Sequence, residues 1–518
     1  MPVRNVNFAS LLASSSKLCL SYILPDNAMP PIYRIPQEVL SEIFKYVLFS
    51  PGLRTVPNST HSPVVSSNNC TTPFLLSHVS KYFHDVVTKN PSLWTSIAFL
   101  YPLPKRLYLT SLWLVYSRRS PLDIVLFEED KDGECNAMVQ LFDLLLQHVE
   151  RWRDLKLSLT GGIPLRVAKV ILSRPTLLRD VDIDTQFDRN AAANIAYKGL
   201  LHSPSLRNLT WKSPVHSPSI RYGAHITSLD LDLPILIGQL INNLAYCPNL
   251  VSLSVAKVRY PTRDPTPINP LKRTVCLPRL RVLILILVSS NYEPNRNSRR
   301  TLVPLLSVLS APCLTQISLK GVADHPDEAY MDEEGDGDRN RVYTRFVVQD
   351  LIRRSSCKLY SLNADIPGAS STEVLAWMNF EGIEALRVLC ISGGEVDDKV
   401  LEALTWDHAA PDGVSLVGKR FPHLMHLGLA VCALDIDDDV LLRMLGSRFW
   451  TPVDPTRPSR NTDGDGAEDT GFEELRTAHI WVRELTPNMK VYEDMMEKCS
   501  KRIKEWVALD RFLEFKIV

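Results

Sequence analysis

The sequence has no apolar run long enough to cross a lipid bilayer. The longest candidate is VLILILV at 282–288. It has the length of a buried strand, whereas a membrane-spanning helix needs about 20 apolar residues. The apolar stretch near the N-terminus is broken by Lys17, although a secretory signal requires a continuous apolar core. We therefore expect no membrane partner and a location in the cytoplasm, the nucleus or both.

Two further shortages exclude whole classes of protein. Neither sign of charge is in excess, since 58 Lys and Arg balance 58 Asp and Glu. Binding to phosphate backbones needs a basic excess or a basic face, so we expect no nucleic-acid partner. The ten cysteines are far apart, with no CxxC and no histidine pair at zinc spacing. They are expected to be buried free thiols rather than disulfides or metal ligands.

Catalytic and metal-binding motifs are also missing. There is no GxSxG, HExxH, P-loop or GxGxxG. The acidic segments 332–343 and 461–472 begin like calcium-binding loops, but position 12, which must be a bidentate Glu, holds Tyr343 and Phe472. His423 and His426 flank a strand leucine and are interpreted as surface residues. We predict a chain that is not an enzyme and needs no cofactor or metal.

The dominant pattern in the sequence is a recurring apolar triplet, L-x-x-L-x-L. Its period-2 ending is typical of a short strand with one buried face. The eleven triplets are spaced irregularly, and several follow a proline, as in SPSL, CPNL and FPHL. Their members are Trp152/Leu155/Leu157, Leu178/Val181/Ile183, Leu206/Leu209/Trp211, Ile226/Leu229/Leu231, Leu250/Leu253/Val255, Leu280/Leu283/Leu285, Leu314/Ile317/Leu319, Leu359/Leu362/Ala364, Leu386/Leu389/Ile391, Leu424/Leu427/Leu429 and Leu475/Ala478/Ile480.

Helical segments between the triplets complete the repeat. A strand and a helix in each 20–29 residues is the signature of leucine-rich repeats, whose units must stack to bury their apolar faces. The predicted fold class is an α/β repeat, a small N-terminal helical domain followed by an irregular, horseshoe-like solenoid. The alternative is an ordinary α/β domain with parallel strands and crossover helices. The recurrence of the triplet and the lack of Gly-rich βα turns favour the solenoid.

The domain boundaries follow from these patterns. Residues 1–30 are expected to be a disordered leader, and Met29 looks like a more natural start. A helical docking domain is expected at 31–100 with a Pro- and Ser-rich loop at 51–72, then a linker or capping segment at 101–150. The degenerate solenoid is predicted at 151–518, with acidic loop insertions near 323–340 and 453–471.

The segment IPQEVLSEIFKYVL at 35–48 predicts an amphipathic helix. Pro36 suits a first helical position, because its missing N–H would be unpaired there. Glu38 favours the positive end of the helix dipole. Apolar side chains then recur in an i, i+1, i+4, i+5 stripe. The segment could instead be a cap that buries this stripe against the solenoid, since terminal repeats require caps.

These residues resemble the F-box. Its opening, Leu-Pro-x-Glu-(Ile/Val)-Leu-x-x-Ile-(Phe/Leu), is matched in order by Ile35, Pro36, Glu38, Val39, Leu40, Ile43 and Phe44. Its second half is matched by Leu76, Val79, Pro91, Leu93 and Trp94. Ser80 replaces the usual Cys and Phe83 the usual Trp. The following segment 94–126 looks like the extension of F-box families expanded in mushroom-forming fungi.

The resemblance implies a substrate receptor of a cullin-based (SCF-type) ubiquitin ligase. The F-box would bind a Skp-family adaptor, and through it a cullin, while the repeats hold an unidentified target protein. The adaptor-binding residues it implies are Ile35, Pro36, Glu38, Val39, Leu40, Ile43, Phe44, Val79, Phe83 and Trp94. Two other classes stay open, namely a leucine-rich-repeat scaffold with no ubiquitin role and an enzyme on a solenoid-like or α/β fold.

The target is expected to bind the sheet side of the solenoid. Triplet residues point into the core, so the residues between them face outward on one face. The mixture there is polar with no overall charge, which suggests a protein ligand. The candidates are Arg207, Asn208, Thr210, Ser228, Asp230, Gln316, Ser318, Met425, His426, Thr477, His479 and Trp481, the last expected to be exposed one step past its triplet.

Overall fold

The fold is described from a computed structural model of the full chain. The residues that it describes are 31–49, 73–100, 104–128, 136–160, 162–172, 175–185, 191–213, 222–259, 274–286, 304–320, 344–366, 369–379, 381–406, 421–432, 436–449, 475–483 and 512–517. The expected leader, the loop at 51–72 and both acidic segments lie outside these residues. Among the described helices, none is long and apolar enough to cross a membrane.

The chain divides into two compact units. The first contains the residues up to Phe99 together with Tyr108–Leu122, and the second contains Leu100–Leu107 and the residues from Asp123 onward. The elements of the first unit are η1 (Pro31–Arg34), α2 (Gln37–Phe49), α3 (Pro73–Ser77), α4 (Lys81–Lys89), η3 (Pro91–Trp94), β1 (Ser96–Leu100) and most of α5 (Pro104–Tyr116).

Local sequence accounts for the helix starts in the first unit. The N–H of Leu40 donates to the carbonyl of Pro36 at 3.0 Å, which makes Pro36 the start of the first hydrogen-bonded turn of α2. Ser80 is the N-cap of α4, where its hydroxyl accepts a hydrogen bond from the N–H of Phe83 at 3.2 Å. Such a cap satisfies one of the amides that a helix start leaves unpaired.

The second unit is an α/β, solenoid-like array built on a parallel sheet. Its strands follow one another in chain order, and every pairing with a described register is parallel. The strands are β2 (Leu122–Phe127), β3 (Trp152–Leu159), β4 (Asp180–Thr185), β5 (Asn208–Lys212), β6 (Ser228–Leu236), β7 (Ser252–Arg259), β9 (Val282–Ile286), β11 (Gln316–Lys320), β12 (Ser361–Asp365), β13 (Val388–Ser392), β14 (His426–Cys432), β15 (Thr477–Arg483) and β16 (Phe512–Ile517).

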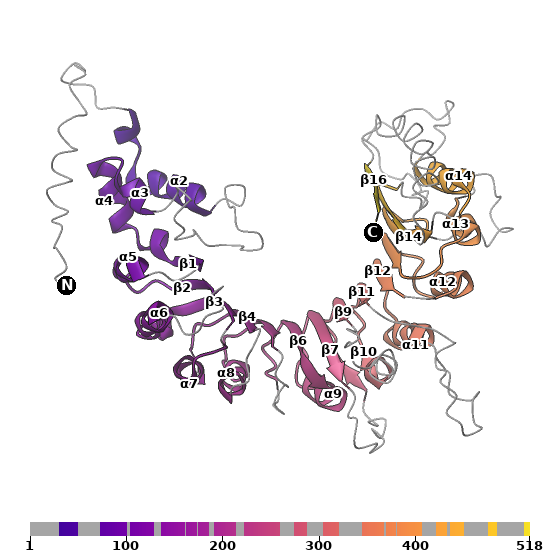
Figure 1. Ribbon diagram of the computed structural model, residues 1–518, viewed down its shortest axis with the longest axis horizontal. Coiled ribbons are helices and arrows are strands. Elements are labelled where there is room, and N and C mark those ends of the chain that lie inside the picture. Colours follow the sequence, from indigo (N-terminus) through magenta and orange to yellow (C-terminus); the bar gives the residue numbers. More distant parts are fainter. Residues whose placement is uncertain are drawn as a thin grey trace, which may run out of the picture. The chain divides into compact units, whose positions relative to one another are not determined.

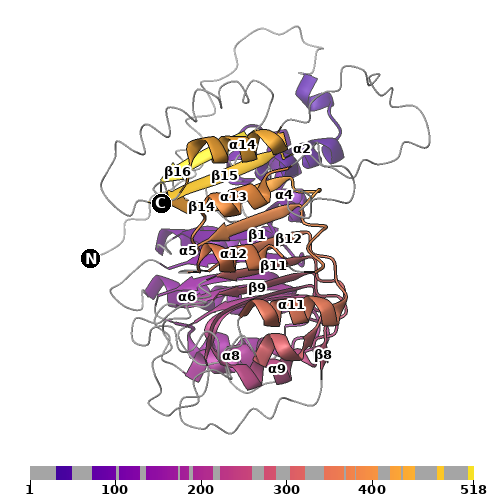
Figure 2. The same ribbon diagram turned by 90° about the vertical axis from the view of Figure 1, so that its right-hand side faces the viewer.

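Helices connect these strands and lie on one face of the sheet (Figure 1). They are α6 (Asn136–Leu146), η4 (Val149–Arg151), α7 (Leu165–Leu172), α8 (Ala191–Leu201), α9 (Ile237–Leu244), α11 (Thr344–Ser355), α12 (Ser371–Trp377), α13 (Asp398–Leu404) and α14 (Asp438–Phe449), with a short pair β8 (Val275–Cys276) and β10 (Leu309–Ser310). Figure 2 shows α11, α12, α13 and α14 in front of their strands. In the described part of this unit no helix covers the opposite side, called here the helix-free face.

The predicted triplets form the core of this unit. The second and third members of all eleven lie in the successive strands of the sheet from β3 to β15, and equivalent members are paired in register, as in Leu155, Val181 and Leu209. No triplet member is more than 3% exposed. Burying a side chain of this size contributes about 1.5–3 kcal/mol relative to leaving it in water. Stacking therefore supplies the core that no single strand–helix unit has.

A ladder of backbone hydrogen bonds also links the repeats at the residue that follows the first triplet member. Each N–H there donates to the carbonyl of the equivalent residue in the preceding repeat, at 2.7–2.9 Å. The ladder runs through Arg153, Arg179, Arg207, Thr227, Val251, Arg281, Thr315, Tyr360, Arg387, Met425 and Arg476. The repeats thus stack in chain order, despite insertions of different length between them.

The segment 101–150, predicted to be a linker or capping segment, contains regular secondary structure. It contains α5, the buried strand β2 and α6. Leu122, Ile124 and Leu126 of β2 are each at most 1% exposed. The triplet pattern missed this strand because its apolar residues alternate without the preceding leucine.

Gly199 of α8 lies directly against the backbone of α7 in the second unit. A Cβ atom there would lie 2.6 Å from the Cα of Leu172 and 2.8 Å from the carbonyl oxygen of Ile171. These are backbone atoms of α7 and cannot move aside without shifting the helix. We expect Gly199→Ala to lower the free energy of unfolding by about 1–2 kcal/mol, because overpacking outweighs the better helix propensity of Ala.

Gly238 in α9 provides the matched control. A Cβ atom there meets nothing within 4 Å, so Gly238→Ala should leave stability unchanged or raise it by up to about 1 kcal/mol. Urea unfolding followed by circular dichroism measures both variants. Equal stability of the Gly199→Ala and Gly238→Ala variants would contradict the described α7–α8 packing.

Candidate protein-docking surfaces

Helix α2 presents two apolar stripes. Leu40, Phe44 and Leu48, at i, i+4 and i+8, are buried at 2–4% exposure. The residues Val39, Ile43 and Tyr46, at i, i+4 and i+7, are 50%, 43% and 74% exposed. Side chains at these spacings lie on one side of a helix. Thus one stripe holds α2 in its unit, and the other faces solvent.

Aromatic contacts hold the buried stripe in place. The ring of Phe44 meets that of Phe83 of α4 edge-on, with ring centroids 5.0 Å apart. The hydroxyl of Tyr82 donates to the carbonyl of Ile35 at 2.6 Å, and its ring lies 5.4 Å from that of Tyr33. These contacts bind the residues just before α2 to α4, so the exposed stripe has a fixed orientation in its unit.

More apolar side chains of the first unit are exposed near the start of α4. Leu75 of α3 is 46% exposed, and Val79, just before the Ser80 cap, is 65% exposed. Ile32 of η1 is 42% exposed. Isolated exposed apolar residues are ordinary, but several on consecutive elements of one small unit are typical of a docking surface. We call Ile32, Val39, Ile43, Tyr46, Leu75 and Val79 the α2 surface.

The residues predicted to bind an adaptor therefore separate into two groups. Ile35, Pro36, Glu38, Val39, Ile43 and Val79 are at least partly exposed. Four others are buried at 0–8% exposure and belong to the core of the unit, so they hold it together, and their predicted contact with a partner stays a prediction. These four are Leu40, Phe44, Phe83 and Trp94.

Trp94 lies at the centre of an aromatic cluster. Its ring centroid is 4.9 Å from that of Phe74, 5.2 Å from Trp113 and 4.6 Å from Tyr116. Its indole N–H donates to the carbonyl of Val87 at 2.8 Å. The side chain is 0% exposed. Trp94 thus joins α4, η3 and α5, and its role in the first unit is structural.

The helix-free face of the second unit is lined by the residues between the triplet members. Most of the predicted target-binding residues are partly exposed there, namely Arg207, Asn208, Thr210, Ser228, Asp230, Gln316, Met425, His426, Thr477 and His479. Ser318 is the exception at 4% exposure, because its small side chain lies between strands with larger residues. The side chain of Trp481 lies outside the described residues, although its backbone pairs with Ala430.

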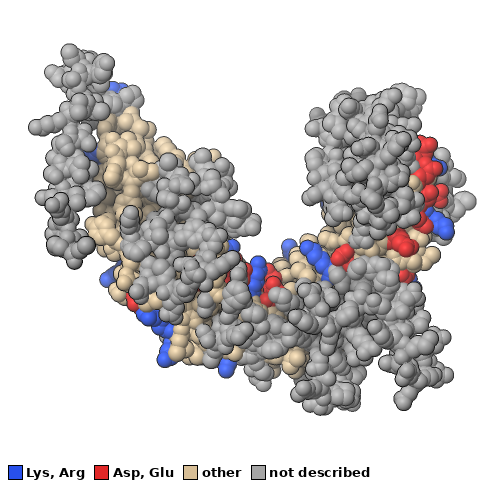
Figure 3. Space-filling view, in the orientation of Figure 1, with Lys and Arg blue, Asp and Glu red and all other residues tan. Residues whose placement is uncertain are grey.

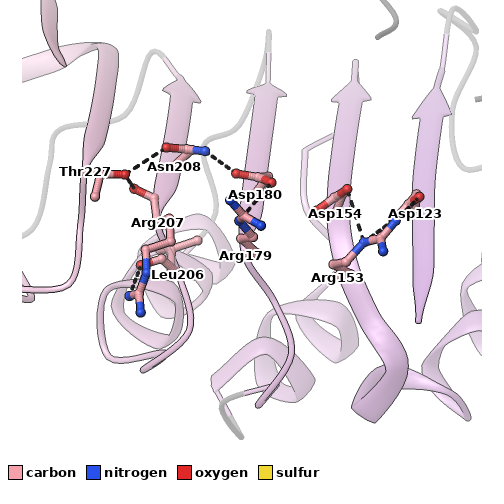
Figure 4. A network of polar contacts seen from close by, with 9 residues as sticks. All are labelled: Asp123, Arg153, Asp154, Arg179, Asp180, Leu206, Arg207, Asn208 and Thr227. Atoms are coloured by element: carbon pink, nitrogen blue, oxygen red, sulfur yellow. Dashed lines mark hydrogen bonds and ion pairs between the residues drawn. The ribbon is translucent and has the colours of Figure 1, made fainter. Parts of the chain in front are cut away.

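Charged residues on this face are concentrated on the early strands. Figure 3 shows acidic and basic side chains next to each other in the described part of the sheet. Lys156 of β3 pairs with Asp182 of β4 at 2.7 Å, and the amide of Asn208 donates to Asp180. Figure 4 shows two runs of polar contacts on these strands, one that joins Asp123, Arg153 and Asp154, and one that joins Arg179, Asp180, Asn208 and Thr227.

At the start of this network one guanidinium serves two carboxylates. Arg153 donates from Nε and Nη2 to the two oxygens of Asp123, at 2.9 and 2.6 Å. Its Nε also lies 3.5 Å from Oδ2 of Asp154. The other oxygen of Asp154 is buried and accepts no hydrogen bond within the described residues. Asp154 is therefore short of partners beside an already paired carboxylate.

This environment raises the pKa of Asp154 from 3.8 to about 7. Burial is the largest cause, and the negative charge of Asp123 is the second. The positive charge of Arg153 acts in the opposite direction, and Asp180 adds a smaller repulsion. The folded protein thus holds a proton at Asp154 in a pH range in which the unfolded chain has lost it.

That shift predicts a pH dependence of stability. Between about pH 4 and pH 7 the folded state binds more protons than the unfolded state, so stability falls as the pH rises. Asp154→Asn removes this titration. We expect the variant to be more stable than the unchanged chain at pH 8, by about 1–2 kcal/mol after allowance for partial solvent screening.

Urea unfolding at pH 5 and pH 8 tests this prediction. The advantage of the Asp154→Asn variant should be larger at pH 8 than at pH 5. A difference that is equal at both values of pH, or larger at pH 5, would contradict the assignment of the titration to Asp154.

The target-binding residues predicted from the sequence include none of the outward residues of β9. On β9 the three outward residues Val282, Ile284 and Ile286 are aliphatic and partly exposed. The sequence VLILILV contains the signal for this aliphatic face, because the residues between its leucines are apolar rather than polar. The run was interpreted as a buried strand. Its triplet members Leu283 and Leu285 are buried as predicted, whereas Val282, Ile284 and Ile286 are partly exposed.

No family model matches the chain, and no curated protein matches it. Within the described ranges no group of three or more His, Cys, Asp or Glu side chains is arranged to hold a metal ion. The candidate docking surfaces of the described residues are the α2 surface and the helix-free face.

Proposed function

We propose that this chain is the substrate-recognition subunit of a cullin-based ubiquitin ligase. In this proposal the first unit is an F-box that binds a Skp-family adaptor, and the second is a leucine-rich-repeat solenoid that binds the target protein. The chain itself performs no covalent chemistry in this role. Its cellular location is the cytoplasm, the nucleus or both.

The observation that carries the proposal is the division of α2 into a buried and an exposed apolar stripe. A helix that only capped the repeats would have no use for a second stripe, since leaving apolar side chains in water forgoes the free energy of their burial. Val39 and Ile43 of the exposed stripe are also positions of the F-box opening motif. The motif residues thus supply both the core of the unit and its exposed apolar surface.

The stacked triplets support the second half of the proposal. Regular strand–helix units with a helix-free sheet face are a frequent basis for protein recognition. A stable complex buries about 800 Å² on each partner, which requires several adjacent strands. The helix-free face offers such strands with mixed polar and aliphatic side chains.

Co-expression of the full chain with a Skp-family adaptor tests the proposal. The expected result is a one-to-one complex that survives size-exclusion chromatography and recruits a cullin. Failure of the folded chain to retain any Skp-family adaptor would reject the ubiquitin role. A leucine-rich-repeat scaffold that uses only the helix-free face would then be the better account.

A further inference from the structure

Strands β6, β7 and β9 give one region of the helix-free face an unusual composition. In register, Asp230 of β6 is paired with Ser254 of β7, which is paired with Ile284 of β9. The two flanking rows also have a small residue on β7 and an aliphatic residue on β9, and the β6 residue is Ser228 in one row and Asp232 in the other. The region, called here the β6–β9 strip, comprises Ser228, Asp230 and Asp232, then Ser252, Ser254 and Ala256, then Val282, Ile284 and Ile286.

The aliphatic edge of the strip faces outward. Of the strands with described side chains on this face, β9 alone has aliphatic residues at all three outward positions. Each of Val282, Ile284 and Ile286 is partly exposed. Their burial by a partner would contribute about 25 cal/mol for each Å² of apolar surface removed from water.

The acidic edge carries a carboxylate without a partner. Asp230 is partly buried between Thr210 and Ser254 in its row, and no described residue gives its side chain a hydrogen bond or an ion pair. Asp182, in the same row, is by contrast paired with Lys156. The charge of Asp230 is therefore available to a partner.

Other charges surround Asp230 at greater separation along the sheet. Lys212 of β5 and Asp232 of β6 lie in the next row and are paired in register with each other. Arg207 precedes β5, and its guanidinium donates to the carbonyls of Pro204, Leu206 and His225. Arg281 precedes β9. None of these groups stands in the row of Asp230.

We propose that the β6–β9 strip binds a protein segment through a Lys or Arg side chain. The charged end of this partner side chain pairs with Asp230, and the aliphatic stem of the same side chain lies over Ser254 and against Ile284. Neighbouring strands are about 4.8 Å apart, so the carboxylate-bearing and aliphatic strands are separated by about 10 Å, which suits a long basic side chain. Such side chains pack their stems on apolar surface and keep the charge in a polar setting.

The row spacing favours an extended segment with alternating residues. Outward positions of a strand repeat every two residues, about 7 Å apart, as do the side chains on one side of an extended peptide. The inference rests on the proposed role of the helix-free face in target binding, and it does not depend on the adaptor. It narrows the target to a protein with an exposed segment in which basic and aliphatic residues alternate.

The test uses the full chain and three fluorescein-labelled octapeptides. One alternates Lys with Val, one alternates Glu with Val, and one alternates Lys with Ser. Fluorescence anisotropy at about 0.1 M salt, where charges beyond about 10 Å are screened, measures the dissociation constants. We expect the Lys–Val peptide to bind most tightly, the Lys–Ser peptide more weakly and the Glu–Val peptide not at all.

Variants of the chain locate the site. Asp230→Asn and Ile284→Ser should each weaken binding of the Lys–Val peptide about tenfold, which corresponds to about 1.4 kcal/mol. Asp184→Asn is the matched control, because Asp184 is on the same face, also lacks a described partner and is two strands away from β6. This control should bind the peptide as the unchanged chain does. Unchanged melting temperatures establish that all variants are folded.

Three results would overturn the inference. The first is that the Lys–Val peptide does not bind at concentrations up to about 1 mM. The second is that the Glu–Val peptide binds as tightly as the Lys–Val peptide. The third is that Asp184→Asn and Asp230→Asn weaken peptide binding equally, which would mean that the attraction is diffuse. The Asp230→Asn variant should still bind the Skp-family adaptor. The double variant Val39→Asp with Ile43→Asp should still bind the Lys–Val peptide. The two measurements therefore distinguish failure of this inference from failure of the proposed function.

Discussion

Replacing Val39 and Ile43 together by aspartate should abolish co-purification with a Skp-family adaptor while the chain stays folded. Both side chains belong to the exposed stripe of α2, so the change places two charges on the surface rather than in the core. A central apolar anchor of an interface is worth about 2 kcal/mol or more. We therefore expect the dissociation constant to rise at least about 30-fold.

The matched control is a double aspartate substitution on another helix of the same unit. Tyr108 and Val115 of α5 are 69% and 67% exposed and lie seven residues apart on one side of the helix. Tyr108→Asp with Val115→Asp should leave adaptor binding within about twofold of the unchanged chain. Equal losses in the two double variants, or undiminished binding in the α2 variant, would reject the α2 surface as the docking site.

Trp94→Ala should destabilise the first unit by about 3–5 kcal/mol. The indole fills the centre of the cluster with Phe74, Trp113 and Tyr116, and its loss also leaves the carbonyl of Val87 without its donor. A loss of this size is a large fraction of the stability of a small domain, which is about 5–15 kcal/mol in total. Urea unfolding followed by tryptophan fluorescence and circular dichroism measures it.

This prediction separates a structural from a contact role for Trp94. Adaptor binding by the Trp94→Ala variant should fall only in proportion to the unfolded fraction of the first unit, and cooling or a stabilising osmolyte should restore it. A variant as stable as the unchanged chain that nevertheless loses the adaptor would place Trp94 in the interface.

The repeat was predictable from the sequence because its rule is local. Each triplet has period 2 over its last three positions, and a half-buried strand follows directly from that spacing. Leu253 and Val255, for example, are buried as predicted, with Ser254 outward between them. Stacking then follows, since no unit can bury its own face.

Features that depend on contacts between distant residues were not predictable. Arg448 of α14 would be expected in solvent, yet it is 1% exposed and donates to the carbonyls of Leu404 and Phe421. Burial lowers its pKa to about 10. The Arg153–Asp123 pair likewise joins residues 30 positions apart. No spacing rule along the chain signals such pairs, because the fold alone brings them together.

The candidate surfaces were predicted only in part, again because they depend on contacts between distant residues. The amphipathic pattern placed apolar residues on α2, but it did not distinguish the stripe of Leu40 and Phe44 from that of Val39 and Ile43. That distinction depends on where α4 packs, through Phe83. The aliphatic β9 residues were missed because periodicity alone cannot separate a strand buried on both faces from one that is buried on a single face.

Hydrogen exchange of the full chain, with and without a Skp-family adaptor, tests the central claim most directly. Amides that become buried at an interface exchange more slowly, and mass spectrometry of peptic fragments localises the change. We expect protection in α2 and around residues 75–79, with no change in peptides from the strands β3 to β15. An adaptor complex whose protection falls on the sheet and leaves α2 unaffected would contradict it.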